Sequence, residues 1–105
     1  MPLLTRGFRT PLLLRRHARL HSHEVNATDD AHYLALADDF LGGSLRDTTR
    51  ECIRQSDSAL IRWDTLTDTY GILSTDGYIL SFYILDRKWH TYPSNRAYFL
   101  SDCRS

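Results

Sequence analysis

Hydrophobic residues near the start of the chain recur with the spacing of a helix. In residues 12–24, the residues that fall at i, i+3, i+4 and i+7 are Leu14, His17, Ala18 and His21. The same period is clearer in residues 30–41, where the apolar stripe consists of Tyr33, Leu36, Ala37, Phe40 and Leu41. Side chains at these spacings share one side of an α-helix. The pattern predicts two helices, each with one face toward a core.

Polar and glycine residues mark the ends of the second helix. A loop over residues 26–30 precedes it, and the candidate N-caps are Thr28, Asp29 and Asp30. Asp38 and Asp39 lie off the apolar stripe. We expect Gly42-Gly43 to end the helix, because glycine takes the left-handed C-cap conformation without steric cost.

Beyond the glycine pair the pattern changes to short strand-like runs, at residues 50–55, 59–64, 69–74 and 78–85. The Asp76-Gly77 dipeptide between the last two runs is a strong hairpin signal. Connections this short force neighbouring strands to be antiparallel. After a loop at 86–93, Ser94 is expected to cap a short helix that reaches Cys103.

These elements predict an α+β fold, in which two N-terminal helices pack on a four-stranded antiparallel β-meander and a short C-terminal helix follows. A chain of 105 residues has room for one core. We therefore expect one domain over residues 12–105, preceded by an irregular basic lead-in at 1–11. No apolar run approaches the roughly 20 residues that span a bilayer, so we expect no membrane span. We also expect a monomer.

Charge is distributed unevenly, although the formal net charge is zero. Residues 1–28 carry five arginines and a single acid, Glu24, for a net charge of +4. Such an arm suits an anionic partner, either nucleic acid or a membrane surface. A solvated helix face with a flexible tail is the alternative. An arginine-rich start without acids is also typical of mitochondrial targeting segments, although Pro2 and Pro11 interrupt any amphipathic helix there.

The two cysteines, Cys52 and Cys103, form no CxxC motif, which argues against a cysteine-based zinc site. They can pair if the final helix packs on the first strand. We expect two buried free thiols, and the disulfide stays the alternative.

Histidines cluster in the first helix, where the sequence HARLHSH places His17 and His21 one turn apart with His23 close by. Three hypotheses compete. The pair could chelate a metal, but no carboxylate accompanies it as in HExxH. The histidines could be exposed residues on a basic helix. They could also act in acid–base catalysis, since imidazole titrates near neutral pH.

Arg62 and Ser81 are the second group of candidates, both within expected strands. An arginine among apolar strand residues needs a partner or a ligand. A salt bridge to Asp64 or Glu51 is the structural explanation, and stabilisation of phosphoryl charge is the functional one. Ser81 matters only if its strand lies beside Arg62 and both face the helix that carries the histidines.

The stretch LIRWDTLTDTYGILSTDGYILSFY, which ends at Tyr83, resembles a toxin-domain signature: hydrophobic, Arg, aromatic, Asp, then Thr, aromatic-Gly and Asp-Gly. The upstream stretch HARLHSHEVNATDDAHYLALADDFL is similar to the same family in order and spacing. This family comprises C-terminal domains of contact-dependent inhibition and Rhs-type polymorphic toxins. It belongs to the barnase/EndoU/colicin-D/RelE-like ribonuclease group. Ser81 departs from the family's Thr, and Ile84-Leu85-Asp86 stands where the family has a basic residue and Pro.

The resemblance implies a metal-independent endoribonuclease toxin that needs no cofactor. Its catalytic residues would be His17, His21, Arg62 and Ser81. The residues that would bind RNA are Arg15, Arg16, Arg19, Trp63, Tyr83 and Lys88, and Tyr33 and Trp89 are further candidates for base stacking. The implied partners are RNA, in particular tRNA, and a cognate immunity protein, and the implied location is the bacterial cytoplasm after delivery. A non-catalytic RNA- or partner-binding module on the same scaffold, or a small antitoxin-like regulator, is the alternative.

Overall fold

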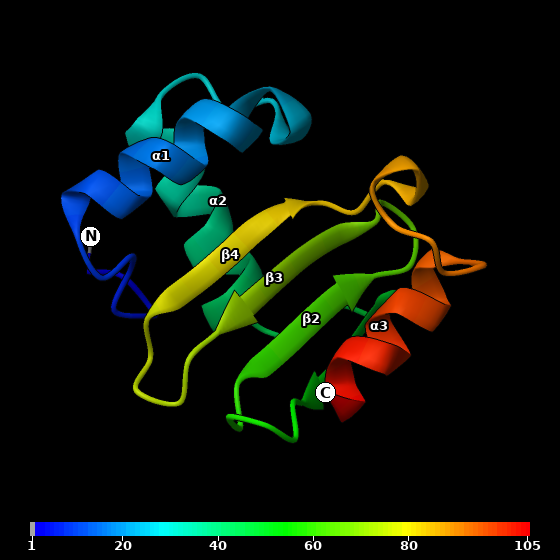
Figure 1. Ribbon diagram of the computed structural model, residues 1–105. Helices are drawn as coiled ribbons and strands as arrows, with labels where there is room; N and C mark the ends of the chain where they lie inside the picture. Colours follow the sequence, from blue (N-terminus) through cyan, green and yellow to red (C-terminus); the bar gives the residue numbers. More distant parts are fainter. Residues whose placement is uncertain (1) are drawn as a thin grey trace.

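The computed structural model describes residues 2–105, so that Met1 lies outside the described residues. In this range the helices are α1 (Pro11–His21), α2 (Asp30–Gly42) and α3 (Asn95–Arg104), and the 3₁₀ turns are η1 (Ser22–Val25) and η2 (Arg87–Trp89). The strands are β1 (Thr49–Ile53), β2 (Leu60–Asp64), β3 (Thr69–Leu73) and β4 (Ile79–Ile84), and they form one antiparallel sheet in the order β1-β2-β3-β4 (Figure 1). The predicted α+β fold is confirmed. The expected first helix, 12–24, is an α-helix to His21 and a 3₁₀ turn beyond it.

Helices cover both faces of the sheet, with α1 and α2 on one side and α3 on the other (Figure 1). Two neighbouring residues of β3 show this directly. A Cβ on Gly71 would lie 2.9 Å from Leu41 Cδ2 of α2, whereas the Tyr70 ring packs 6.4 Å, between centroids, from Phe99 of α3. Successive side chains in a strand point to opposite faces, so the molecule has three layers with the sheet in the middle.

Each face of the sheet has its own apolar cluster. The one beneath α1 and α2 consists of Ala18, Tyr33, Ala37, Phe40, Leu41, Ile79 and Phe82. The one beneath α3 consists of Ala59, Ile61, Trp63, Tyr70, Ile72, Leu85 and Phe99. The stripe predicted for the second helix is therefore confirmed as its core face, with Leu36 packed half-buried at the margin.

The helix ends follow short-range polar signals with one exception. Asp29 is the N-cap of α2 and Ser94 that of α3, through side-chain oxygens that accept from His32 N and Ala97 N. The expected left-handed glycine cap of α2 is wrong, since Gly43 has φ −81°. Glycine is needed there for space instead, because a Cβ would lie 2.5 Å from the carbonyl oxygen of Asp39.

The N-terminal segment is bound to the domain, which contradicts the alternative of a flexible tail. Asp38, only 6% exposed, accepts hydrogen bonds from Leu4 N (2.9 Å), Thr5 N (2.8 Å) and Thr5 Oγ1 (2.6 Å). Farther along, Phe8 forms a parallel bridge with Ile79 of β4. The carboxylate off the apolar stripe of α2 thus holds the lead-in against the helix.

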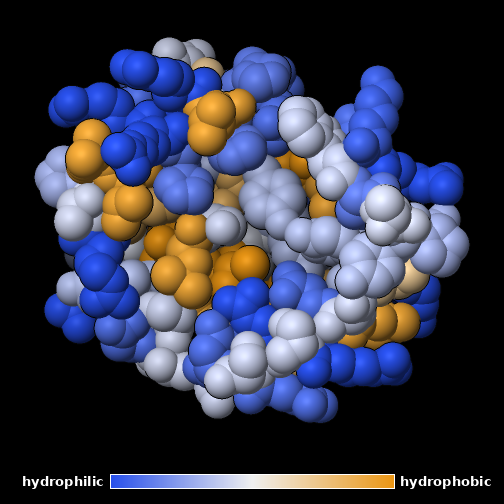
Figure 2. Space-filling model, viewed as in Figure 1, coloured by the Kyte–Doolittle hydropathy of each residue, from blue (hydrophilic) through white to orange (hydrophobic). Residues whose placement is uncertain are grey.

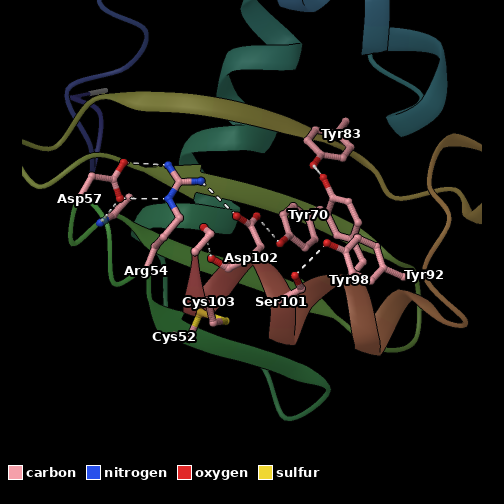
Figure 3. Close-up of polar contacts among 12 residues, drawn as sticks. Cys52, Arg54, Asp57, Tyr70, Tyr83, Tyr92, Tyr98, Ser101, Asp102 and Cys103 are labelled. Atoms are coloured by element: carbon pink, nitrogen blue, oxygen red, sulfur yellow. Dashed lines mark hydrogen bonds and ion pairs between the residues drawn. A yellow bond between two sulfur atoms is a disulfide. The ribbon is translucent and has the colours of Figure 1, made fainter.

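A disulfide joins Cys52 of β1 to Cys103 of α3, so the expectation of two free thiols is wrong (Figure 3). The condition for pairing is met because α3 crosses the sheet above β1. Next to the disulfide, Asp102 accepts from Arg54 Nη1 (3.2 Å) and from the Tyr70 hydroxyl (2.7 Å). The last turn of α3 is therefore fastened to the sheet covalently and by a partly buried polar network.

None of the helices within residues 2–105 is long and apolar enough to cross a membrane.

Replacing Asp38 by Ala should lower the free energy of unfolding by about 2–4 kcal/mol, because hydrogen bonds to a charged acceptor contribute about 1.5–3 kcal/mol each. Asp39→Ala is the matched control, since the neighbouring carboxylate is exposed and makes only a surface ion pair with Arg46. That change should cost less than about 1 kcal/mol. Urea denaturation measures both, and equal midpoints for the two variants would show that Asp38 does not hold the lead-in.

Loss of the disulfide should also lower the free energy of unfolding. The cysteines are 51 residues apart, and a loop of that length corresponds to about 4 kcal/mol of unfolding free energy. We expect a dithiol reductant to lower the urea midpoint of the native protein to that of the Cys52→Ala/Cys103→Ala variant, which itself should not respond to the reductant. An unchanged native midpoint under reduction contradicts the expectation.

Candidate functional site

A hollow of about 540 Å³ opens where the end of α1, the edge strand β4 and the segment from η2 to α3 meet. Its imidazoles are His21, His23 and His90. Its other polar or aromatic side chains are Glu24, Ser81, Tyr83, Asp86, Trp89 and Tyr98. In the space-filling view, hydrophobic groups lie at the centre of the same face with hydrophilic groups around them (Figure 2). The hollow brings together two of the four predicted catalytic residues, His21 and Ser81.

His21 and Glu24 form a hydrogen-bonded pair at this hollow. The His21 Nδ1 lies 2.9 Å from Glu24 Oε2, and the other carboxylate oxygen accepts from the backbone N–H of Ile84 at 3.0 Å. The pair arises because α1 ends at His21 and the tighter turn η1 brings the residue three positions later back over the imidazole. A carboxylate can only accept in this contact, so Nδ1 carries a proton; in the neutral imidazole Nε2 is then the acceptor, which is the state of a general base.

Glu24 is the residue that sequence reasoning missed. In the sequence, Glu24 stands out only as the single acid of the N-terminal arm. The available signal was the spacing HSHE, which puts a carboxylate three residues after His21. Its role depends on the contact with Ile84, 60 residues away, and no local pattern announces that contact.

His17 lies behind His21 and outside the hollow. Its ring packs 5.0 Å from Phe8 and 6.2 Å from His21, measured between centroids, and its Nδ1 is buried with no hydrogen-bond partner among the described residues. Burial, and then the neighbouring His21, lowers the pKa of His17. His17 is therefore a neutral packing residue that supports His21 from the core side.

The structure does not bring Arg62 and Ser81 together. β3 lies between their strands, and the register pairs Arg62 with Gly71, on the face of α2, while Ser81 pairs with Ile72 on the face of α3. Ser81 was expected to matter only if its strand lay beside that of Arg62 and both faced the same helix. Neither condition holds.

Arg62 instead has three structural partners. Its guanidinium donates to Glu51 Oε2 (2.8 Å) and to the carbonyl oxygens of Phe40 (3.1 Å) and Gly43 (2.8 Å). It thereby satisfies carbonyls that a helix leaves unpaired at its C-terminus. Of the two acids expected to pair with Arg62, Glu51 forms the ion pair.

Asp64, the other expected partner of Arg62, is the last residue of β2 and bonds elsewhere. Burial raises its pKa, but hydrogen bonds from the hydroxyls of Thr49 and Thr48 and from the N–H groups of Leu66 and Thr67 outweigh burial and lower the pKa to about 2. The carboxylate thus joins the start of β1 to the β2–β3 turn.

Two tyrosines join the hollow to the anchor of α3. The hydroxyls of Tyr83 and Tyr98 lie 3.5 Å apart, and the rings of Tyr70 and Tyr83 pack 5.5 Å apart between centroids (Figure 3). Burial, and then the contact with Tyr98, raises the pKa of Tyr83, so its hydroxyl remains protonated at neutral pH. Tyr83 offers the hollow an aromatic ring and a neutral donor.

His90 is held by two hydrogen bonds that fix its tautomer. Its Nδ1 accepts from Tyr92 N (3.2 Å) and its Nε2 lies 2.8 Å from Asn95 Oδ1. A neutral ring with Nε2–H satisfies both contacts. His90 thus forms a fixed wall, while its partner Asn95 also donates to the carbonyl oxygen of Leu85.

The predicted RNA-binding residues divide into accessible and buried ones. Arg15, Arg16 and Arg19 line a second, shallow hollow on the exposed side of α1, and Leu20 borders both hollows. Lys88 is exposed on η2, and Tyr83 is half-buried at the first hollow. Trp63, at 6% exposure, and Tyr33, at 0%, are core side chains and cannot stack on a base.

Within residues 2–105, no group of three or more His, Cys, Asp or Glu side chains is placed to hold a metal ion.

The chain matches no protein-family model, no curated protein and no solved structure. The resemblance to toxin domains therefore remains an expectation from the sequence.

Removing Arg62 should destabilise the protein. Arg62→Ala leaves two helix-terminal carbonyls and Glu51 without their donor, and we expect a loss of about 2–4 kcal/mol in unfolding free energy. Arg96→Ala, which removes an exposed guanidinium from α3, should stay within about 0.5 kcal/mol of the native value. Thermal and urea melts compare the two. A native-like melt for Arg62→Ala would return this residue to the list of functional candidates.

Proposed function

We propose that the protein is an endoribonuclease that cleaves RNA at the hollow between α1 and β4, with His21 as general base. The hydrogen-bonded pair of His21 and Glu24 carries the proposal, because a carboxylate that holds Nδ1–H leaves Nε2 free to accept a proton. The arginines of α1 support it, since they line a neighbouring hollow that Leu20 shares, and guanidinium groups are suited to phosphate. RNA carries its nucleophile, the 2′-OH, beside each phosphate.

In the proposed reaction His21 Nε2 takes the 2′-OH proton, and the 2′ oxygen attacks the adjacent phosphorus. The bond to the 5′ oxygen breaks, and that oxygen receives a proton from His23, the second imidazole of the α1–η1 segment at the hollow. The products are a 2′,3′-cyclic phosphate and a free 5′-OH. The Ser81 hydroxyl stabilises the phosphorane by hydrogen bonding. The arginines of α1, in the neighbouring hollow, bind adjacent phosphates of the RNA backbone.

The wider role follows the family resemblance. We propose a toxin that acts on tRNA in the cytoplasm of a bacterial cell and is neutralised by a cognate immunity protein. An acidic surface on that protein would complement α1, whose eleven residues include three arginines and no acid.

A second candidate is an RNA-binding module without catalysis. The engagement of Arg62 in the fold favours it, because the hollow then lacks the strand arginine that the family resemblance implies. The two candidates differ in whether bound RNA is cut.

The test is RNA cleavage by the purified protein and its variants. His21→Ala should reduce the rate about 10²- to 10⁴-fold, the usual contribution of a general base. Glu24→Gln, which keeps a hydrogen-bond acceptor but not the charge, should reduce it less. His32→Ala is the control, because it removes an imidazole that bonds only within the Thr28 loop.

Product ends and metal dependence complete this test. Activity should survive EDTA, and the downstream fragment should accept a label from a kinase without prior dephosphorylation. Fragments with 5′-phosphate, or loss of activity with EDTA and recovery with Zn²⁺, contradict the mechanism. Binding of RNA without any cleavage supports the second candidate.

A further inference from the structure

Trp89 differs sharply from the other tryptophan of the chain. It is 84% exposed at the border of the hollow, whereas Trp63 is 6% exposed in the core. A large aromatic ring left in water contributes little to folding, since the stability gained from such a ring comes from its buried apolar area. Its position calls for a function.

The backbone beneath Trp89 is well held. In η2 the Asp86 side chain accepts from Lys88 N (2.9 Å), and Trp89 N donates to the Asp86 carbonyl oxygen (3.0 Å). The next residue, His90, is fixed by Tyr92 and Asn95. The ring is presented from an anchored turn.

An aromatic wall borders the same hollow as Trp89. The His90 ring lies 4.8 Å from that of Tyr98, which also borders the hollow, and Tyr92 packs edge-on against Tyr98 at 5.7 Å, both between centroids. The His21–Glu24 pair borders the same hollow from the end of α1 and η1. The hollow therefore has one side made of flat rings and another side that carries the base.

The charges beside Trp89 favour a ligand with an anionic backbone. Arg87 and Lys88 precede it in η2, and both are exposed. An exposed aromatic ring flanked by cations is the arrangement by which proteins bind single-stranded nucleic acid, where bases stack on rings and phosphates lie on cations. A hollow of about 540 Å³ also falls within the roughly 300–1,000 Å³ of sites for small ligands.

We propose that Trp89 is the stacking platform of a nucleobase subsite, which takes an unpaired base next to the phosphate held at His21. The inference rests on the proposed function and specifies its substrate as RNA with an unstacked base. A base within a duplex cannot reach Trp89, because its two faces are covered by the neighbouring base pairs.

Binding to an RNA that cannot be cleaved tests this subsite. The probe is a six-nucleotide single strand with 2′-O-methyl groups, compared with a strand of the same length and charge that has abasic positions. Trp89 fluorescence, taken as the difference between the native protein and Trp89→Phe, should be quenched by the first strand and not by the second. Trp63 is buried and contributes the same signal to both proteins.

The variants separate stacking from charge. Trp89→Ala should weaken binding of the base-bearing strand about 5- to 150-fold and leave binding of the abasic strand unchanged, while Trp89→Phe keeps most of the affinity. Leu66→Ala is the control, since Leu66 is 78% exposed in the turn between β2 and β3, outside the hollow. Equal affinity for the two strands, or no quenching, overturns the subsite.

Failure of the subsite is distinguishable from failure of the enzyme. If the base-bearing strand binds through Trp89 but natural RNA is never cut, the subsite stands and the catalytic proposal falls. If RNA is cut while the base-bearing and abasic strands bind equally, cleavage stands and the subsite falls.

Discussion

Strand β3 carries both helical layers, because its neighbouring residues point to opposite faces of the sheet. On one face Gly71 has no side chain, which allows Leu41 of α2 to lie against the backbone. On the other face Tyr70 is fully buried, packs on Phe99 and donates its hydroxyl to Asp102 of α3. The same alternation determines which groups can act together. In β2 it places the Arg62 side chain on the α2 face, and in β4 it places the Ser81 side chain on the opposite face, at the hollow.

The two sides of the hollow are held in place by different elements of the fold. His21 is oriented by Glu24, which is itself held by the last N–H of β4, so the helical layer and the sheet edge meet at one carboxylate. The aromatic wall depends on η2 and α3, whose far end is tied to β1 by the disulfide and to Arg54, the residue after β1, by an ion pair. Tyr83 of β4 connects the two sides, because its ring packs 5.6 Å from that of His21 and its hydroxyl contacts that of Tyr98.

Local patterns predicted the fold well because its elements are formed by local signals. The stripe of α2, the Asp76-Gly77 turn and the Ser94 cap each depend on a few adjacent residues, and each lies where the sequence indicates. Apart from the local cap at Gly43, the features that the sequence did not reveal depend on contacts between distant segments. The buried carboxylate of Asp38 needs the lead-in, the Arg62 guanidinium needs the end of α2, and Glu24 needs Ile84. The histidine spacing singled out His21, which the structure places at the hollow, but its carboxylate partner appears only in three dimensions.

The Cys52–Cys103 bond also limits how the chain can pass through a narrow channel. Its two cysteines are 51 positions apart, so the bond closes a covalent ring that contains β2, β3, β4, η2 and most of α3. A linear polypeptide can be drawn through a passage one chain wide from either end. A ring of this size must enter as two strands side by side. A narrow passage therefore admits the unfolded dithiol form and excludes the disulfide form, so that translocation as an extended chain has to precede formation of this bond or follow its reduction.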